Sequence, residues 1–405
     1  MLEITVAGVG TGANTITPEV MKAINASDII FASSRFENLI PTDKKFIPLK
    51  NFNYVFNYID STKSRVIILV SGDPGIYSLL HLVKKRFPNE NIKVLPGISS
   101  LQNICAHACE IWTDAKILSG HGRNLSPGKF LNAVERNRVT ILFCDSVISP
   151  KWACENLATC IPEVEVFIGE NLGQADERIL TGKPDDFINY EFAELSIVLV
   201  RNNSVYKPVS LRDKDFIRAN SIVMTNENVR AVILSKLGLD DNSIFWDIGA
   251  GTGSVSITAA NEFPDSEIYA IERKPEAAEL ISMNAKKFHV HNINIYNDRA
   301  LNVIKNLPKP SHVFIGGSDG ELSGILEYIA ELENNIRVVV ACVTLENFNA
   351  AYEFMKGEKD FEAVQISVTS SKSLNSNLTL MSAHNPVMLL SCEFGAEEGT
   401  RTPMS

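Results

Sequence analysis

Short apolar runs alternate with longer amphipathic stretches along most of the chain. Val66–Val70 is apolar at every position, which is typical of a strand buried on both faces of a parallel sheet. Between such runs apolar residues recur at helical spacing, and Thr17 before Pro18 marks the start of one helix. Further strands are predicted in the first half at Leu2–Ala7, Ile92–Leu95, Val139–Cys144, Val164–Ile168 and Leu195–Val200. This alternation predicts an α/β fold.

The second half shows the same alternation more regularly. Five predicted strands are separated by helical segments, and two more follow without a convincing helix between them. A closing pair of strands of this kind predicts a mostly parallel sheet with one antiparallel strand. The seven strands are predicted at Ile244–Asp247, Glu267–Ile271, Ile293–Tyr296, His312–Ile315, Ile336–Ala341, Glu362–Val368 and Pro386–Cys392.

A chain of 405 residues is too long for one ordinary core, so two domains of about 200 residues each are expected. The polar stretch Asn202–Ser204 and the nearby Pro208 are typical of a linker. We therefore predict domains at residues 1–206 and 207–394. Residues 395–405 show no periodicity and are predicted to be a disordered tail.

Composition narrows the class of protein. The hydrophobic fraction of 45% and the charged fraction of 21% are typical of a soluble globular protein, and no apolar run approaches the roughly 20 residues that span a bilayer. The chain begins directly on a predicted strand, which favours a cytoplasmic location. A net charge of -10 argues against nucleic-acid binding, although an anionic substrate would still need a local basic patch. The seven cysteines contain no C-x-x-C pair, and we interpret them as reduced and structural.

Two glycine loops, each placed between a predicted strand and a predicted helix, carry the first indication of chemistry. One is Gly8-Val9-Gly10-Thr11-Gly12, and the other is Gly249-Ala250-Gly251-Thr252-Gly253. Such a turn brings backbone N–H groups close to a ligand. Two of them suggest two nucleotide-type sites.

Carboxylates distinguish the second loop from the first. Glu272 ends the next strand, where a carboxylate accepts both ribose hydroxyls, and Asp298 with Ala300 follows the third strand and is expected to hold an adenine. Asp247 ends the strand before the loop. S-adenosylmethionine fits this set best, because it has no pyrophosphate and acidic residues suit its ammonium and sulfonium groups. An NAD-type Rossmann domain is the alternative.

The surroundings of the second loop suggest a large substrate. Thr225 precedes a predicted helix and is expected to close over the methionine end of the donor. Gly316 and Gly317 end the fourth strand and leave the floor of the site open for a large, flat molecule, unless they form only a structural turn.

In the first half the informative residues lie away from the glycine loop, which lacks a matching carboxylate. Gly72-Asp73-Pro74 and the pair Ser99-Ser100 follow two successive strands, so they are expected to meet at the carboxyl edge of one sheet. His121 is the candidate base, and Arg35 and Arg123 are candidates for pairing with substrate carboxylates. The structural alternatives are a buried turn for His121, a turn-capping side chain for Asp73 and a surface position for Arg35. His289 and His291 are not expected to bind a metal.

Both halves resemble known families. Thr225–Ala231, the Gly249 loop, Phe314–Gly317 and Val343–Asn347 resemble the decarboxylating precorrin C15-methyltransferases over about residues 212–393. Gly72–Pro74, Ile98–Gln102 and His121–Arg123 resemble the precorrin C5-methyltransferase branch of the tetrapyrrole methylase family over about residues 2–200. Thr11 departs from that pattern, because relatives usually have proline there, which puts the rigidity of the loop in doubt.

The resemblance implies a two-lobed tetrapyrrole methylase fold followed by a Rossmann-like, seven-stranded class I methyltransferase fold. It implies one S-adenosylmethionine per domain, bound at Gly72–Pro74 and Ser99–Ser100 in the first, and it puts Gly8, Gly10 and Gly12 beside the tetrapyrrole. The implied chemistry is methylation of C5 and C15 of a precorrin with loss of carbon dioxide from the C12 acetate. No metal is required from the protein.

Other readings stay open at this stage. They are methylation of a different large planar substrate at the second site, a non-catalytic sensor of the methyl donor, and an NAD-dependent oxidoreductase. The sequence leaves open whether the substrate carries cobalt. A homo-oligomer is expected, but no sequence feature gives its size.

Overall fold

The computed structural model describes residues 3–62, 64–121, 125–332, 335–375 and 378–395. The chain divides into two compact units, residues 1–125 with 137–205 and residues 126–136 with 206–405. The predicted boundary after residue 206 stays a prediction, and most of the predicted tail, residues 396–405, lies outside the described residues. None of the helices in the described part of the chain is long and apolar enough to cross a membrane.

The first unit opens with a parallel five-stranded sheet in the order β3-β2-β4-β1-β5. Every residue of the central strand β4 is buried, as its apolar sequence predicts. The Thr17 hydroxyl accepts the N–H of Val20 and so caps the first helix. The strands are β1 (Glu3–Gly8), β2 (Ile29–Ala32), β3 (Lys45–Pro48), β4 (Val66–Val70) and β5 (Asn91–Leu95), and the helices are α1 (Pro18–Ala26), α2 (Phe52–Ser61) and α3 (Leu80–Arg86).

A second five-stranded sheet in the first unit has the order β6-β7-β10-β8-β9 and is mixed. Sequence analysis did not identify β6 and β9, because these short edge strands are only partly buried and lack an apolar run. The strands are β6 (Lys116–Ser119), β7 (Val139–Phe143), β8 (Glu165–Glu170), β9 (Arg178–Gly182) and β10 (Ser196–Arg201), and the helices are α4 (Ser100–His107) and α6 (Pro150–Cys160).

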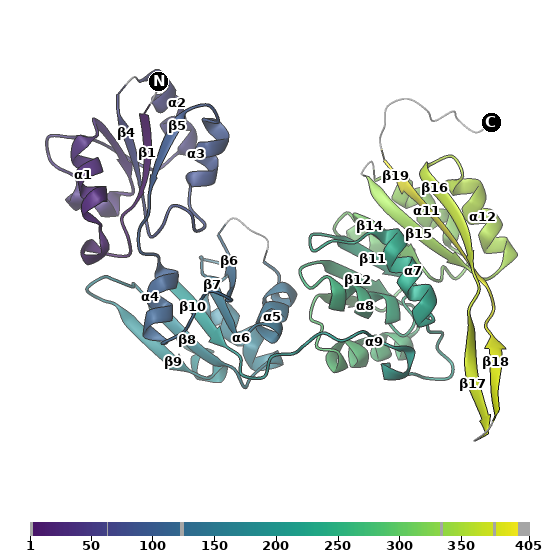
Figure 1. Cartoon of the computed structure of the whole chain (residues 1–405). Coiled ribbons are helices and arrows are strands. Elements are labelled where there is room, and N and C mark those ends of the chain that lie inside the picture. The colour runs from purple at the N-terminus through teal and green to yellow at the C-terminus, as the bar shows by residue number, and fades with distance from the viewer. Residues whose placement is uncertain (1–2, 63, 122–124, 333–334, 376–377, 396–405) are drawn as a thin grey trace. The chain divides into compact units, whose positions relative to one another are not determined.

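The second unit is built on a seven-stranded sheet in the order β13-β12-β11-β14-β15-β19-β16 (Figure 1). β19 runs antiparallel to both of its neighbours and the other six strands run parallel to one another, so the predicted sheet is confirmed. The strands are β11 (Ile244–Ile248), β12 (Glu267–Ile271), β13 (Ile293–Tyr296), β14 (His312–Ile315), β15 (Ile336–Cys342), β16 (Lys359–Ile366) and β19 (Val387–Phe394).

Helices cover both faces of this sheet and bury two apolar clusters, one on each side. The helices are α7 (Glu227–Leu237), α8 (Ser254–Glu262), α9 (Pro275–Lys287), α10 (Ala300–Val303), α11 (Leu322–Ala330) and α12 (Leu345–Met355). Taken with the sheets of the first unit, this arrangement confirms the predicted α/β fold class.

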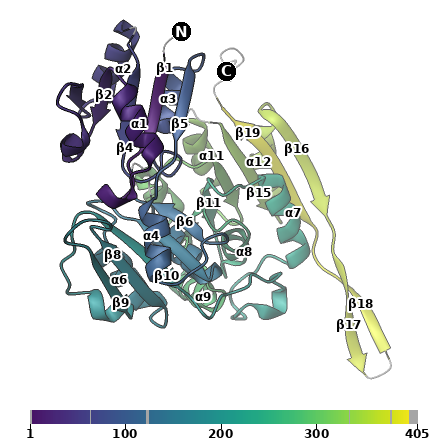
Figure 2. The ribbon, with the colours of Figure 1, turned by 60° about the vertical axis from the view of Figure 1, so that its left-hand side comes forward.

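A two-stranded ribbon, which sequence analysis did not predict, extends from the seven-stranded sheet (Figure 2). It consists of β17 (Thr369–Asn375) and β18 (Leu378–Ala383), inserted between β16 and β19. Leu378, Leu380 and Met381 are exposed on it. We call this ribbon the arm.

Helix α5 (Pro127–Arg136) packs within the second unit, although the sequence on both sides of it belongs to the first. A Cβ on Gly128 would lie 2.4 Å from the carbonyl oxygen of His291, so the helix backbone lies directly against that segment. The buried Asn132 side chain donates to the carbonyl oxygen of Pro264 (2.9 Å) and to Asn292 Oδ1 (2.9 Å), and it accepts the N–H of His291 (3.0 Å). Helical periodicity gives no sign of which core a helix joins.

Replacing Asn132 with alanine is expected to destabilise the second unit by about 2 kcal/mol or more, because buried backbone groups lose their partners. Urea unfolding followed by tryptophan fluorescence measures this, since Trp246 is buried in the same unit. The control is Asn57→Ala on α2, where the asparagine is exposed. Equal midpoints for the two variants would contradict the packing of α5.

Candidate functional site

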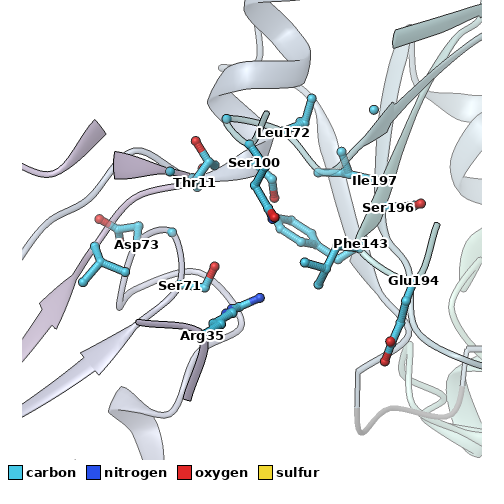
Figure 3. A pocket seen from close by; sticks show the side chains of 18 of the residues that line it. Thr11, Arg35, Ser71, Asp73, Ser100, Phe143, Leu172, Glu194, Ser196 and Ile197 are labelled. Atoms are coloured by element: carbon cyan, nitrogen blue, oxygen red, sulfur yellow. The ribbon is translucent and has the colours of Figure 1, made fainter. Parts of the chain in front are cut away.

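The first unit contains a cleft of 690 Å³ whose wall comes from loops and strands of both of its sheets. Arg35, Ser71 and Asp73 lie on one side, in loops at the carboxyl ends of β2 and β4 (Figure 3). Phe143 and Ile197, from β7 and β10, lie on the other side. The strand-end segments that the sequence singled out therefore meet at one cleft.

Backbone packed against backbone forms one side of this cleft. A Cβ on Gly8 or on Gly97 would lie 2.3 Å from the carbonyl oxygen of Gly72, so neither position can hold a side chain. Gly10 and Gly72 form an antiparallel bridge in which the N–H of Gly72 donates to the Gly10 oxygen over 2.8 Å. Gly8 and Gly10 thus support the cleft from behind, while Gly12 lies in its wall.

Asp73 and the two serines organise the loops that meet there. Asp73 Oδ1 accepts the N–H of Gly75 (2.7 Å) and Oδ2 accepts the N–H of Gly97 (3.2 Å), so one carboxylate joins two strand-end loops. Ser99 caps α4 through the N–H of Gln102. Asp73, Ser99 and Ser100 line the cleft, whereas Pro74 lies behind it, next to Gly8. The turn-capping role considered for Asp73 is present together with its place in the wall.

Thr11, which departs from the family pattern, is held by hydrogen bonds. Its hydroxyl accepts from Asn103 Nδ2 (2.8 Å), and the N–H groups of Thr11 and Gly12 donate to Thr15 Oγ1 at 2.9 and 3.0 Å. Gly12 lies directly against the backbone of Gly173. The loop is therefore fixed without a proline.

Two charged candidates reach the cleft, and the third is not described. Arg35 lies in the wall and is exposed, so the surface position considered for it is present together with its place in the cleft, and partial desolvation lowers the pKa of its guanidinium group. The ion pairs among the described residues include none to Arg35. His121 lines the cleft near Asp145, whose pKa is lowered by the N–H groups of Ile148 and Val147 and by the neighbouring His121. Arg123 lies outside the described residues.

Sequence reasoning missed Tyr77, which belongs to the same loop as Asp73. Its hydroxyl donates to the carbonyl oxygen of Ile117 (2.9 Å) on β6, and its ring meets Phe143 edge-on at 5.4 Å. Its φ of +43° is in the left-handed region, which is unfavourable for a tyrosine. Because Tyr77 follows Gly75 by two residues, the sequence could have placed it near the same site. The neighbouring residues in the sequence do not indicate that its ring reaches the second sheet.

The second unit has a pocket of 350 Å³ at the carboxyl ends of β11, β12, β13 and β14. Gly249 (φ +72°) and Gly251 (φ +58°) turn the loop through left-handed conformations. A Cβ on Gly249 would lie 2.4 Å from the oxygen of Gly317, and one on Gly251 would lie 2.6 Å from the oxygen of Val223. The glycine loop at residues 249–253 is therefore in direct contact with Gly316-Gly317, the predicted floor of the site.

Glu272 faces the glycine loop from the end of β12. Its Oε2 accepts the N–H of Gly251 (2.9 Å) and its Oε1 accepts the N–H of Lys274 (2.9 Å), so both oxygens are oriented by backbone donors. It lines the pocket, as do Asp298 and Ala300 after β13. Asp298 accepts from Asn302 Nδ2 and from the N–H of Arg299, and these bonds lower its pKa.

The other predicted donor-site residues divide into two groups. Ala250 and Thr225 line the pocket, and the carbonyl oxygen of Thr225 accepts from the buried Arg230 guanidinium (2.9 Å). Thr252 is buried and Gly253 lies immediately before α8, and neither is part of the pocket wall. The cationic rim of the pocket, Arg273 and Arg299, was missed by sequence reasoning.

Asp247 lies fully buried at the end of β11, below the loop. Its Oδ2 accepts from the N–H and the hydroxyl of Ser256, while Oδ1 has no hydrogen-bond partner. Burial raises the pKa of this carboxyl group to about 6, and the charge of Glu272 contributes to the increase.

The cysteines and the histidine pair do not form a metal-type cluster. All seven cysteines are free thiols. His289 pairs with Glu135 (2.6 Å) and stacks on the ring of Tyr206 at 4.7 Å. The described residues contain no group of three or more metal-binding side chains.

Two family models match the chain in succession. The tetrapyrrole (corrin/porphyrin) methylases match residues 3–187, and the precorrin methyltransferase domain matches residues 218–393. The second half is 36% identical over 186 residues to cobalt-precorrin-6B C15-methyltransferase (decarboxylating) of Salmonella typhimurium, covering 45% of this chain and 95% of that protein.

A relative from Sinorhizobium matches both halves. It is precorrin-6Y C5,15-methyltransferase (decarboxylating), 26% identical over 363 residues, with 85% of each chain covered. Among solved structures, a precorrin-6Y C5,15-methyltransferase from Geobacter metallireducens is 35% identical, with a TM-score of 0.42 and coverage of 47% of this chain and 98% of that one.

The raised pKa of Asp247 predicts a pH-dependent stability. Because the folded pKa is about 6 and the ordinary value is 3.8, the stabilisation of the neutral form is complete below pH 3.8 and is lost as the pH rises to about 6. The loss amounts to about 3 kcal/mol. Asp247→Asn keeps an acceptor for Ser256 and removes this titration.

Urea unfolding of both proteins at pH 4 and pH 7 measures the effect. The stability of Asp247→Asn relative to the natural protein is expected to rise between the two pH values. A constant difference would show that the carboxyl group titrates normally.

Proposed function

The chain belongs to the precorrin methyltransferases of cobalamin biosynthesis, and on this premise we propose that it is a bifunctional enzyme acting on precorrin-6Y or its cobalt-containing equivalent. One unit methylates C5, and the other methylates C15 and removes the carboxyl group of the C12 acetate. The succession of the two family matches supports this assignment, as does the Sinorhizobium relative, which matches both halves.

Methyltransferases of this family use S-adenosylmethionine, and we propose one donor site in each unit. The observation that carries the proposal is that each unit has its own strand-end cavity beside a glycine loop, 690 Å³ in the first and 350 Å³ in the second. Because the sulfonium methyl group is already activated, the protein has mainly to align it with a ring carbon and exclude water.

In the first unit, the donor lies against the loops of Asp73 and Ser99, and the macrocycle lies toward Gly12 and Arg35. Arg35 supports this arrangement, since its guanidinium lies in the cleft wall and makes no ion pair with another described residue, which leaves it available to a substrate carboxylate. The methyl group moves from sulfur to C5, leaving S-adenosylhomocysteine. His121 then takes the proton that C5 loses.

In the second unit, Glu272 accepts the ribose hydroxyls, and Asp298 and Ala300 hold the adenine. The macrocycle lies over Gly316-Gly317, between the exposed Val223 and Val343 at the pocket edge. The C12 acetate loses carbon dioxide when its C–C bond breaks. The bonding electron pair passes into the conjugated ring, which later takes up a proton.

We also propose that the protein forms a homo-oligomer through contacts of the arm. A second proposal is that the protein is cytoplasmic. An isolated two-stranded ribbon is only marginally stable in water, and among the described residues β17 and β18 form a sheet of their own that is joined to no third strand. Leu380 and Met381 supply apolar surface for a second copy of the chain.

The cysteines support the proposed cytoplasmic location. All seven are free thiols, which is the state that a reducing compartment maintains.

Calorimetric titration with S-adenosylhomocysteine tests the two donor sites. Two equivalents per chain are expected for the natural protein. Glu272→Ala should weaken the second site by more than roughly tenfold and leave the first unchanged, because a charge-assisted bond contributes about 1.5–3 kcal/mol. Glu276→Ala, at an exposed glutamate of α9, is the matched control.

Mass spectrometry of products from a precorrin-6 intermediate assigns the reactions. Glu272→Ala should still add one methyl group and release no carbon dioxide. A natural protein that binds one equivalent of donor analogue, or a variant that loses both methyl transfers, would overturn the two-site assignment.

Light scattering tests the arm. The natural protein is expected to have a multiple of the 44.7 kDa chain mass, and the double variant Leu380→Asp with Met381→Asp should shift toward the single-chain mass. Ile111→Asp introduces a charge at an exposed apolar residue of the first unit and should leave the mass unchanged. A monomeric natural protein would refute the proposal.

A further inference from the structure

The rim of the second pocket carries an ion-pair network that joins three strand-end loops. Arg273 follows β12, Arg299 follows β13 and Asp319 follows β14, and all three line the pocket. Asp319 Oδ2 lies 2.8 Å from Arg273 Nη1 and 3.9 Å from Arg299 Nη2. Arg299 also pairs with Glu321 over 2.9 Å. Asp319 therefore contacts both arginines at the entrance, and Glu321 is the nearer partner of Arg299.

Asp319, the acidic residue that contacts both arginines, lies in a turn of left-handed residues. Asp319 has a φ of +48°, in the left-handed region, and Gly320 follows with a φ of +85°. The side chains of Arg273 and Asp319 are each 46% exposed. Because solvent screens such a pair strongly, it contributes little to stability and is easily exchanged for another carboxylate.

The proposed substrate carries several carboxylates, so its binding site needs cationic side chains such as these arginines. The chain has a net charge of -10, whereas a precorrin carries acetate and propionate side chains, so overall electrostatics disfavour their association. Local basic groups must compensate at the site. Arg273 and Arg299, with Lys274 beside them, are the cationic side chains in the wall of this pocket.

We propose that Arg273 and Arg299 bind carboxylates of the tetrapyrrole in the second site, and that Asp319, together with Glu321 at Arg299, occupies them until the substrate arrives. This inference rests on the proposed function and adds to it the residues that recognise the polycarboxylate. Guanidinium groups suit the task because they form bidentate pairs with carboxylates.

Arg273 and Arg299 could instead contact the donor nucleoside, and ligand affinities distinguish this role from binding of the tetrapyrrole. Glu272 and Asp298, the residues proposed to hold the donor nucleoside, line the same pocket. If the arginines instead enclosed the nucleoside, their loss would weaken binding of S-adenosylhomocysteine. Affinities for a tetrapyrrole and for the donor analogue must therefore be measured on the same variants.

The experiment uses the full chain and two stable porphyrins. Uroporphyrin carries acetate and propionate side chains, and in coproporphyrin methyl groups replace the acetates. In fluorescence titrations, Arg273→Gln and Arg299→Gln should each weaken uroporphyrin binding by roughly tenfold, with a smaller effect on coproporphyrin. Binding to the first unit is common to all variants, so it does not change the comparison. S-adenosylhomocysteine affinity should stay within about twofold, well below the tenfold effect of one charge-assisted bond.

Asp319→Asn gives the opposite expectation. Asparagine tolerates the left-handed conformation, so the loop is kept while the competing charge is removed, and uroporphyrin should bind several-fold more tightly. The matched controls are Arg65→Gln and Asp28→Asn, an arginine–aspartate pair 3.2 Å apart with similar exposure in the first unit. Neither control should change the affinity for either ligand.

Three outcomes would overturn the inference. They are unchanged uroporphyrin binding in the arginine variants, an equal loss of donor-analogue affinity, and weaker uroporphyrin binding in Asp319→Asn. Each leaves the proposed function standing if the natural protein still adds two methyl groups and releases carbon dioxide. Failure of those reactions would refute the proposed function, whatever the porphyrin titrations give.

Discussion

Both cavities depend on backbone segments that approach each other more closely than any side chain permits. In the first unit the carbonyl oxygen of Gly72 lies where a Cβ on Gly8 or Gly97 would be, and in the second Gly249 lies against Gly317 in the same way. These contacts join loops that follow strands of the same parallel sheet, so they fix the spacing of the loops that line each cavity. A methyl group at one of these positions would separate the loops and widen the site.

Carboxylates organise the two sites by the same physical means and with different results. Asp73 and Glu272 each accept two backbone N–H groups, which orients both oxygens and joins loops that are distant in sequence. Asp73 accepts one N–H from its own loop, at Gly75, and one from the loop after β5, at Gly97, and these loops border the broad cleft of the first unit. Glu272 acts at the end of β12, beside the turn of the glycine loop. The resemblance between the loops is therefore a resemblance of backbone geometry, in two differently built sites.

The predictable part of the fold was the part encoded locally. Buried strands such as β4 and β11 are recognisable because nearly all of their residues are apolar and buried. The closing pair β16 and β19 was predicted from the lack of a helical segment between them. The edge strands β6 and β9 and the arm were missed, since partly exposed strands need no apolar run. Residues 127–136 fall within the predicted first domain, whereas helix α5 packs in the second unit, where its hydrogen-bond partners lie about 130 to 160 residues away along the chain.

The sequence by itself determined the α/β class, the two glycine loops and the strand-end residues Asp73, Glu272 and Asp298, because spacing along the chain sets which residues follow a strand. Only the tertiary structure decided that Gly8 and Gly10 lie behind the first cleft and that Tyr77 reaches the second sheet. The same is true of Arg273 and Arg299 meeting at Asp319. Such contacts join loops whose distance depends on the order of strands in a sheet, and no local periodicity records that order.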